Sequence, residues 1–247
     1  MYNYLIRKES MGDIVKFSET NISIKAKTEK VAEIIIYDII GSSYWDETVS
    51  AKSFCDELSK LPESIETINV RINSPGGDVF DGQTIYNRLK QHKAKIVVYV
   101  DAMAASIASI IAMAGDEIIM SEGSQMMIHK PMTGRHGNSI ELQEAIDLLD
   151  SVEEQMLGIY SRRTGTDKEE IRQMLAAETW LTAEQAVDMG FATKAMEKDE
   201  EFKAVACDLS RVTWFKRPEA VTVPTQTDIV KDDIKKTLGE LTEFLDK

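Results

Sequence analysis

The feature that most constrains the fold is an alternation of short β-rich runs with helical patterns along residues 31–196. Runs rich in Ile and Val, bounded by turn residues, predict strands at residues 31–40, 67–73, 95–100, 117–120 and 126–129. Helical patterns predict helices at residues 50–60, 78–92, 104–114 and 139–163. Capping patterns predict helix starts at Asn138, Asp167 and Thr182. Strands that alternate with helices favour an α/β fold with a largely parallel sheet.

The two ends differ in composition from this middle zone. Residues 1–30 are polar and weakly patterned, so we expect an N-terminal extension before a folded domain at residues 31–196. Residues 197–247 begin with the charge run EKDEE and continue through a polar stretch with two prolines, which indicates a linker. Apolar residues then recur at helical spacing, so residues 229–246 are expected to form an amphipathic helix.

The charge balance argues against several functions. Lysine and arginine number 29 and aspartate and glutamate 42, which gives a formal net charge of −13. We therefore do not expect sequence-independent binding to nucleic acid or docking to anionic membranes, since both require clustered positive charges on the protein. Its most apolar stretch, residues 103–114, is shorter than the roughly 20 residues of a membrane-spanning helix. The N-terminus lacks the apolar run of a signal peptide, so we expect a cytoplasmic protein.

One serine lies where a nucleophile could be exposed. Ser106 follows the expected strand at residues 95–100, at the start of an apolar helix, in the sequence DAMAASIAS. At such a strand–turn–helix junction the helix N-terminus points at the reacting group, and small neighbours let backbone and substrate approach. Ala104 and Ala108 stand where glycines are usual. A tightly packed core helix is the alternative interpretation.

A glycine pair follows another expected strand. In the sequence INSPGGD, residues 72–78, Pro75 fixes one backbone angle, whereas Gly76 and Gly77 leave the backbone free. Paired glycines can turn their N–H groups outward and form an anion cradle or an oxyanion hole. An ordinary strand-to-helix turn capped by Asp78 is the alternative.

A histidine and a carboxylate could complete the chemistry of Ser106. His129 follows three apolar residues, so we expect its imidazole at the edge of the core, either as a general base or as a packed polar group. A base of this kind needs a carboxylate that orients it. Glu178 is the best candidate among several acids, because Trp180 and Leu181 should bury its segment, although spacing alone does not select it.

Four motifs, in this order and at these distances, resemble the proteolytic subunit of the Clp serine protease family: INSPGGDV, AASIAS, MMIHKP and ETWLTAEQAVDMG. The similarity covers residues 31–193 and is strongest to the phage and prophage branch, the head-maturation proteases. The resemblance implies a fold like that of crotonase-type enzymes, a spiral of strand–strand–helix units. It also implies that the helix over residues 139–163 is a projecting handle.

The resemblance gives roles to individual residues of this chain. Ser106 takes the position of the nucleophile and His129 that of the general base. Glu178 stands where the family has an aspartate, two residues before an aromatic residue. The N–H groups of Gly77 and Ile107 match the oxyanion hole.

The resemblance also indicates how substrate binds and what the reaction requires. Gly76, Asp78, Val79 and Met132 match positions that hold the substrate chain as an added strand. No metal and no organic cofactor is implied, because a hydroxyl, an imidazole and two N–H groups supply the chemistry.

The function implied is a serine endopeptidase that processes capsid or scaffold proteins of a phage or prophage. Family members form rings, often two stacked heptamers, so the expected partners are a polypeptide substrate, further copies of the chain, and an ATP-driven unfoldase or a capsid protein. Two alternatives remain open at this point. One is an inactive ring-forming assembly protein of the same fold, and the other is a crotonase-like acyl-CoA enzyme.

Overall fold

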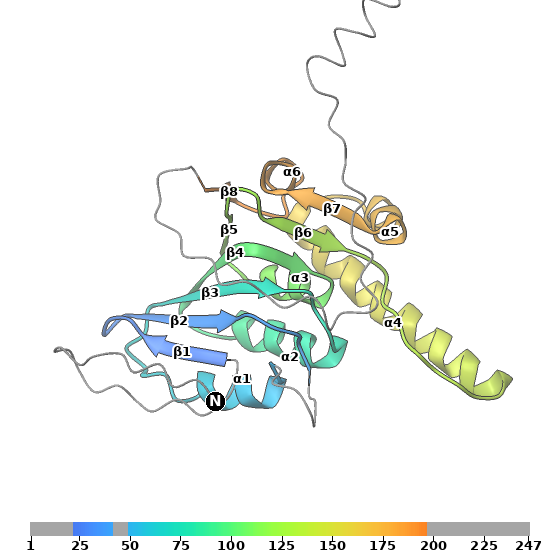
Figure 1. Cartoon of the computed structure of the whole chain (residues 1–247), viewed down its shortest axis with the longest axis horizontal. Coiled ribbons are helices and arrows are strands. Elements are labelled where there is room, and N and C mark those ends of the chain that lie inside the picture. The colour runs from blue at the N-terminus through green and yellow to red at the C-terminus, as the bar shows by residue number, and fades with distance from the viewer. Residues whose placement is uncertain (1–21, 42–48, 197–247) are drawn as a thin grey trace, which may run out of the picture. The chain divides into compact units, whose positions relative to one another are not determined.

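The computed structural model describes residues 22–41 and 49–196 (Figure 1). Within these ranges the strands are β1 (Ile22–Ala26), β2 (Val31–Ile36), β3 (Thr67–Ser74), β4 (Lys95–Ala105), β5 (Glu117–Met120), β6 (Gln125–Ile128), β7 (Thr179–Thr182) and β8 (Lys194–Ala195). The helices are α1 (Ala51–Leu58), α2 (Val79–Lys90), α3 (Ile107–Ala112), α4 (Ser139–Thr164), α5 (Lys168–Ala177) and α6 (Ala183–Asp188). The helix expected at residues 229–246 and most of the expected N-terminal extension lie outside the described residues.

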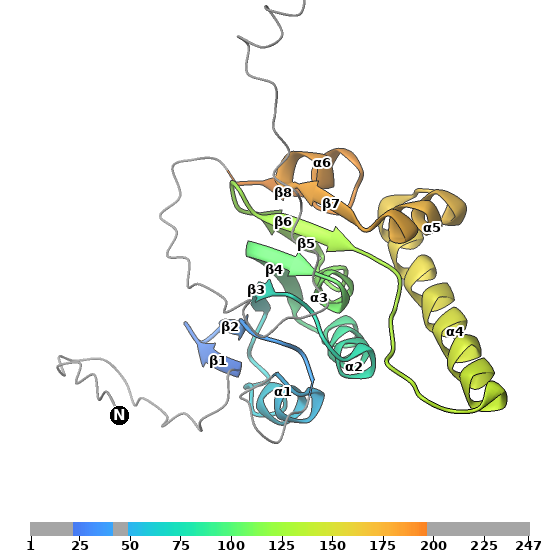
Figure 2. The same cartoon turned by 45° about the vertical axis from the view of Figure 1, so that its right-hand side comes forward.

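The described strands form one sheet in the order β1-β2-β3-β4-β5-β8, and β6 pairs with both β4 and β7. Only the pairs β1–β2 and β6–β7 are antiparallel within this sheet. Figure 2 shows α1, α2 and α3 side by side along one face of the strands. The α/β fold with a largely parallel sheet is therefore confirmed.

The core lies between the sheet and these helices. One row of β-branched residues crosses four neighbouring strands in register, and every member is fully buried: Ile34, Val70, Val98 and Ile118. Helix α3 is buried along its whole length. Burial on this scale explains why the sequence pattern identified these strands, since Ile and Val suit a pleated surface covered by helices.

The boundary between β4 and α3 differs from the sequence prediction. The strand was expected to end at residue 100 and the helix to begin at residue 104, but β4 continues to Ala105 and α3 begins at Ile107. The last residues of β4 are alanines, which carry no strand signal. They are extended because they pair with β6, in the register Ala104 with Met126 and Ala105 with Met127. Tertiary pairing here overrides local propensity.

The sequence analysis did not predict three short strands, β1, β7 and β8. Strand β1 precedes residue 31, where the folded domain was expected to start, and pairs with β2 along its whole length. Strand β7 has only four residues, of which Leu181 alone is buried. Such short, half-exposed strands are defined by their partners and leave little periodicity in the sequence.

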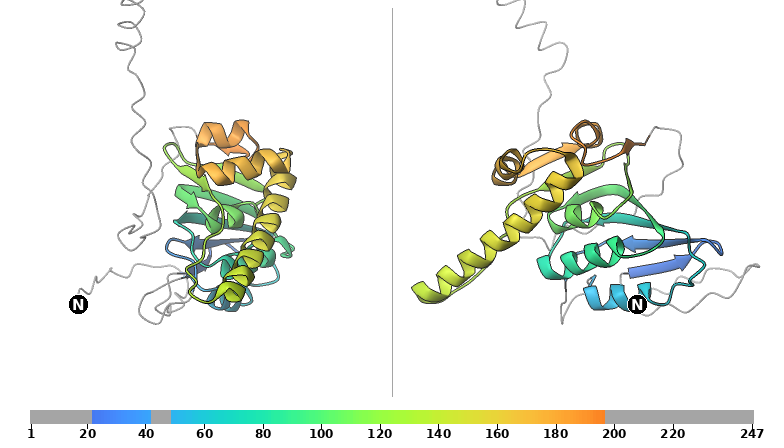
Figure 3. Two further views of the ribbon diagram at one scale, coloured as in Figure 1. Left: turned by 90° about the vertical axis from the view of Figure 1, so that its right-hand side faces the viewer. Right: turned by 180° about the vertical axis from the view of Figure 1, so that it is seen from behind.

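Helix α4 has one half packed on the body and one half that projects from it (Figure 3). It begins with a reciprocal capping box between Asn138 and Glu141, as the sequence predicted. Residues of its second half are buried, whereas its first half exposes the apolar side chains of Ile140, Leu142, Ile146 and Leu148. No helix in the described part of the chain is long and apolar enough to cross a membrane.

A buried hydrogen bond joins α4 to the first turn of α3. The Ser109 hydroxyl donates its only hydrogen to the carbonyl oxygen of Ser106 at 2.5 Å, so it accepts from the Tyr160 hydroxyl, 2.8 Å away. Tyr160 is fully buried and also contacts Phe191, with ring centroids 5.7 Å apart. Burial raises the pKa of Tyr160, which keeps the phenol protonated as the donor.

We therefore expect Tyr160→Phe to lower the free energy of unfolding by about 1 kcal/mol, because it removes the donor and leaves the packing intact. Urea denaturation of the two proteins measures this difference. Equal unfolding midpoints would show that the hydrogen bond between Ser109 and Tyr160 contributes nothing to the free energy of unfolding.

Candidate active site

Ser106 occupies a strained backbone position between β4 and α3. Its φ of 55° and ψ of −128° lie in a region that non-glycine residues rarely adopt. The conformation is held from two sides. The Ser106 N–H donates to the carbonyl of Met127 at 2.9 Å, and the Ser106 carbonyl accepts from the N–H of Ser109 at 3.0 Å. Because both backbone groups are fixed, the side chain is held at the sharp turn where the strand becomes a helix.

His129 lies directly after β6 and reaches the hydroxyl of Ser106. The distance from His129 Nε2 to Ser106 Oγ is 2.7 Å, which is a hydrogen bond. The parallel pairing of Ala105 with Met127 brings the ends of β4 and β6 together, so the two residues meet although 23 positions separate them. His129 is only 7% exposed, which limits the freedom of its ring.

Glu178 lies opposite His129 at the end of the β6–β7 ladder. The last antiparallel pair is Ile128 with Thr179, so the next position of the same register places His129 across from Glu178. Glu178 has a φ of 52° and caps the C-terminus of α5, which ends the strand at this point. Of the acids that the sequence offered, Glu178 is the one whose negative charge acts on the imidazole and raises the pKa of His129.

Two opposed effects act on the pKa of His129. Burial lowers it, because the charged imidazolium loses its hydration, and the negative charge of Glu178 raises it. The first effect is larger, so the net pKa is below the ordinary value. A neutral imidazole protonated on Nδ1 leaves Nε2 free to accept the proton of the Ser106 hydroxyl.

The glycine loop after β3 lies against this serine. A Cβ at Gly76 would stand 2.7 Å from the Cβ of Ser106, so only glycine permits this approach. Ile40 donates its N–H to the Gly76 carbonyl at 2.8 Å and accepts from the N–H of Asp78 at 2.7 Å. Ile40 and Gly77 thus form a parallel bridge, in which Ile40 bonds to the residues on either side of Gly77 and the N–H of Gly77 points away from Ile40.

The remaining residues named from the sequence surround this loop and the segment after β6. Ile107 is the first residue of α3, where an N–H has no acceptor inside the helix. Asp78 caps α2, because its Oδ1 accepts from the N–H groups of Phe80 and Asp81 at 2.9 Å each. Val79 begins α2, and Met132 is 56% exposed after β6. Within the described ranges, no group of three acidic, histidine or cysteine side chains could hold a metal ion.

Comparison with known proteins identifies the family. The model of the family described as Clp protease matches residues 37–199, which is more than half of the chain. The chain belongs to the Clp protease family. Membership implies a peptidase. The chain is 34% identical over 143 residues to the ATP-dependent Clp protease proteolytic subunit of Ligilactobacillus salivarius, covering 57% of this chain and 73% of that protein.

The chain is also similar to a second curated relative and to a solved structure. The ATP-dependent Clp protease proteolytic subunit of Porphyromonas gingivalis is 29% identical over 136 residues, which cover 54% of this chain and 61% of that protein. A solved structure of a ClpP1 mutant from Listeria monocytogenes superposes with a TM-score of 0.59 at 23% identity. The superposition covers 68% of this chain and 92% of the other, and it supports the fold alone.

The environment of His129 predicts an unusual titration. In NMR spectra of the Clp protease chain, we expect the imidazole of His129 to titrate below the ordinary pKa of 6.5, since burial favours its neutral form. Glu178→Gln should lower the midpoint further, because it removes the charge that favours the imidazolium. Glu184→Gln, on the exposed start of α6, is the matched control and should change nothing. A midpoint that rises in Glu178→Gln would contradict the placement of this carboxylate.

Proposed function

We propose that this protein is a serine endopeptidase in which Ser106, His129 and Glu178 act as a catalytic triad. The observation that supports it most is the 2.7 Å contact between Ser106 Oγ and His129 Nε2, at a serine held in a strained turn. A nucleophile within hydrogen-bond reach of a base, which a third group orients, is the arrangement that activates a hydroxyl. Family membership fits this chemistry, since it implies a peptidase.

In the proposed reaction, Ser106 Oγ attacks the carbonyl carbon of the substrate while His129 Nε2 takes its proton. The peptide C–N bond then breaks, and His129 returns the proton to the departing amine. This leaves an ester between Ser106 and the acyl part of the substrate. Water, deprotonated by His129, attacks the ester and restores the hydroxyl. Glu178 would keep the imidazole in the required orientation and stabilise its charged form.

The negative charge that develops on the substrate oxygen requires donors that are already in place. We assign this role to the N–H groups of Gly77 and Ile107, because the first points away from Ile40 and the second opens α3 without an acceptor in the helix. Removal of one such donor typically raises the barrier by about 2.7–4 kcal/mol. Both N–H groups belong to the backbone, so the site needs no metal or organic cofactor for this step.

The substrate chain is proposed to bind beside the glycine loop. Gly76, Asp78 and Val79 would line the bound peptide. The backbone of Gly76 and Asp78 is already hydrogen-bonded within the chain, so the N–H of Val79, which opens α2 without an acceptor in the helix, would be the donor to an extended peptide. The exposed side chain of Met132 would contact the residues of the peptide from the other side. Asp78 also keeps the start of α2 in place through its cap, so its carboxylate has a structural role as well.

Assembly and biological role complete the proposal. We propose that copies of the chain form a ring, in which the projecting half of α4 contacts other copies, because its exposed apolar side chains favour self-association. The motifs resemble phage and prophage head-maturation proteases, which supports capsid or scaffold proteins as substrates. An ATP-driven unfoldase is the alternative partner, because the two relatives are named as ATP-dependent proteases.

The decisive experiment is labelling with a fluorophosphonate serine probe, together with cleavage of unfolded proteins followed by mass spectrometry. Ser106→Ala should abolish both, and His129→Ala should slow both by a thousandfold or more, on the order of the losses seen when triad members are removed. Ser124→Ala is the control, since the hydroxyl of Ser124 is buried and has no hydrogen-bond partner within the described residues. An unlabelled wild-type protein in every oligomeric state would instead favour a structural ring component.

A further inference from the structure

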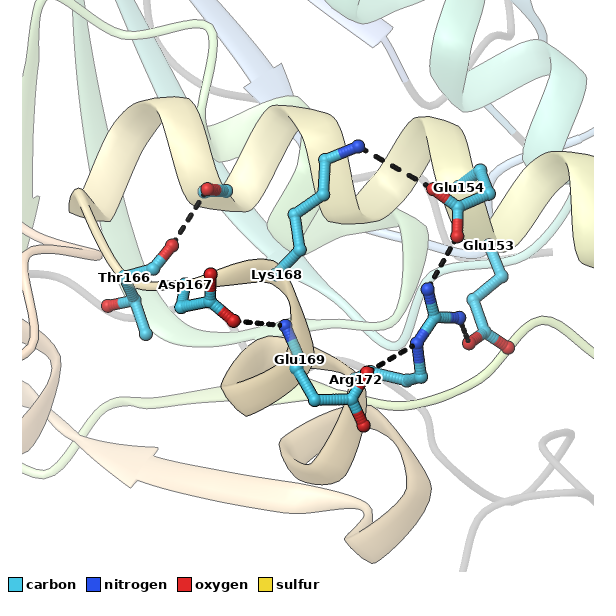
Figure 4. A network of polar contacts seen from close by, with 8 residues as sticks. Glu153, Glu154, Thr166, Asp167, Lys168, Glu169 and Arg172 are labelled. Carbon is cyan, nitrogen blue, oxygen red and sulfur yellow. Dashed lines mark hydrogen bonds and ion pairs between the residues drawn. The ribbon is translucent and has the colours of Figure 1, made fainter.

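A buried carboxylate connects the segments that carry His129 and Glu178. Glu153 lies in α4, and its side chain is only 8% exposed. Its Oε2 is 3.0 Å from Nζ of Lys130. Its Oε1 is 2.7 Å from Nη1 of Arg172 in α5, a contact that Figure 4 shows. A buried acid with each oxygen engaged by a cation from a different segment fixes the distance between those segments.

Both cations stand close in the chain to the proposed catalytic groups. Lys130 directly follows His129, and its backbone N–H donates to the Leu175 carbonyl of α5 at 3.2 Å. Arg172 lies in the same helix, which ends at Ala177 and has Glu178 as its C-terminal cap. The contacts of Glu153 therefore lie just beyond the end of the β6–β7 ladder, where the Lys130–Leu175 hydrogen bond links the backbones of the two segments.

We propose that Glu153 is a positioning residue for the His129–Glu178 pair, acting through Lys130 on one side and Arg172 on the other. The inference rests on the proposed function. Glu153 touches no reacting group, so it acts by holding the imidazole and the carboxylate at their working separation. Positioning of this kind affects the chemical step more than the binding of substrate, because misplaced groups slow the reaction even when the substrate still binds.

Glu154 provides a matched control on the same helix. It contacts the same arginine and also Nζ of Lys168, at 3.5 Å, but it is 53% exposed and no contact joins it to Lys130 (Figure 4). Glu154→Gln thus removes an equal charge, one residue away, from the same network. A general effect of charge or of helix stability would appear in both variants, whereas positioning of His129 would appear in Glu153→Gln alone.

The first test measures kcat and KM for cleavage of an unfolded protein substrate. We expect Glu153→Gln to lower kcat roughly 10- to 100-fold with little change in KM, and Glu154→Gln to leave both nearly unchanged. Lys130→Met should lower kcat to a similar extent, and the double variant should be no slower than either single one, because all break the same link. Equal effects of Glu153→Gln and Glu154→Gln, or single effects that multiply in the double variant, would overturn the proposal.

Lys130→Met also covers the case in which Glu153→Gln fails to fold. The Lys130 side chain is 49% exposed, so its removal is tolerable, and full kcat in this variant would refute the link. A second readout does not depend on catalysis. The shift that Glu178→Gln causes in the NMR titration of His129 should shrink in the Glu153→Gln background. If the shift of the His129 titration is the same in both backgrounds, the positioning role of Glu153 is wrong, whether or not the protein is active. If the wild-type protein cleaves no substrate, the proposed function is contradicted, but the positioning role is not.

Discussion

The site depends on the pairing of β6 with the last residues of β4. This short parallel contact aligns Ala105 with Met127 and supplies the carbonyl that holds the N–H of Ser106. Without it, Ala105 would lose its partner Met127, and the N–H of Ser106 would lose the carbonyl that helps to hold the strained turn. The same pairing brings His129 to the serine, so one backbone interaction fixes both the conformation of the hydroxyl and the position of its partner.

Strand β6 positions residues at both of its edges, because it lies between β4 and β7 in the sheet. Its parallel edge brings His129 to Ser106, and its antiparallel edge ends at the pair of Ile128 with Thr179, next to His129 in one chain segment and Glu178 in the other. The ladder ends where Glu178 turns into a left-handed conformation, so the segments beyond it are held by the Lys130–Leu175 backbone hydrogen bond and by side-chain contacts. Behind the serine, Ser109 and Tyr160 connect α3 to α4, while Glu153 connects α4 to the other side of the site. Helix α4 therefore supports the site at two points.

Sequence reasoning located the main elements because burial leaves a pattern. The central strands are rich in Ile and Val, and the capping pairs at Asn138 and Thr182 form as expected. The end of β4 was missed, since pairing with β6 is a long-range interaction that alanines do not reveal. The sequence favoured Glu178 over other acids only through the burial expected from Trp180 and Leu181 and through the family resemblance, because spacing alone does not show which acid faces the imidazole. Glu153 looked like one more charge on a helix, and only the fold shows that it is buried.

A crystal structure of the full chain with a peptide boronate tests the central claim most directly. Boron should bond to the Oγ of Ser106, with His129 Nε2 within hydrogen-bond distance of the adduct. One boronate oxygen should lie about 2.7–3.1 Å from the N–H groups of Gly77 and Ile107. A boronate bound elsewhere, or an adduct whose oxygen points away from both N–H groups, would contradict the account.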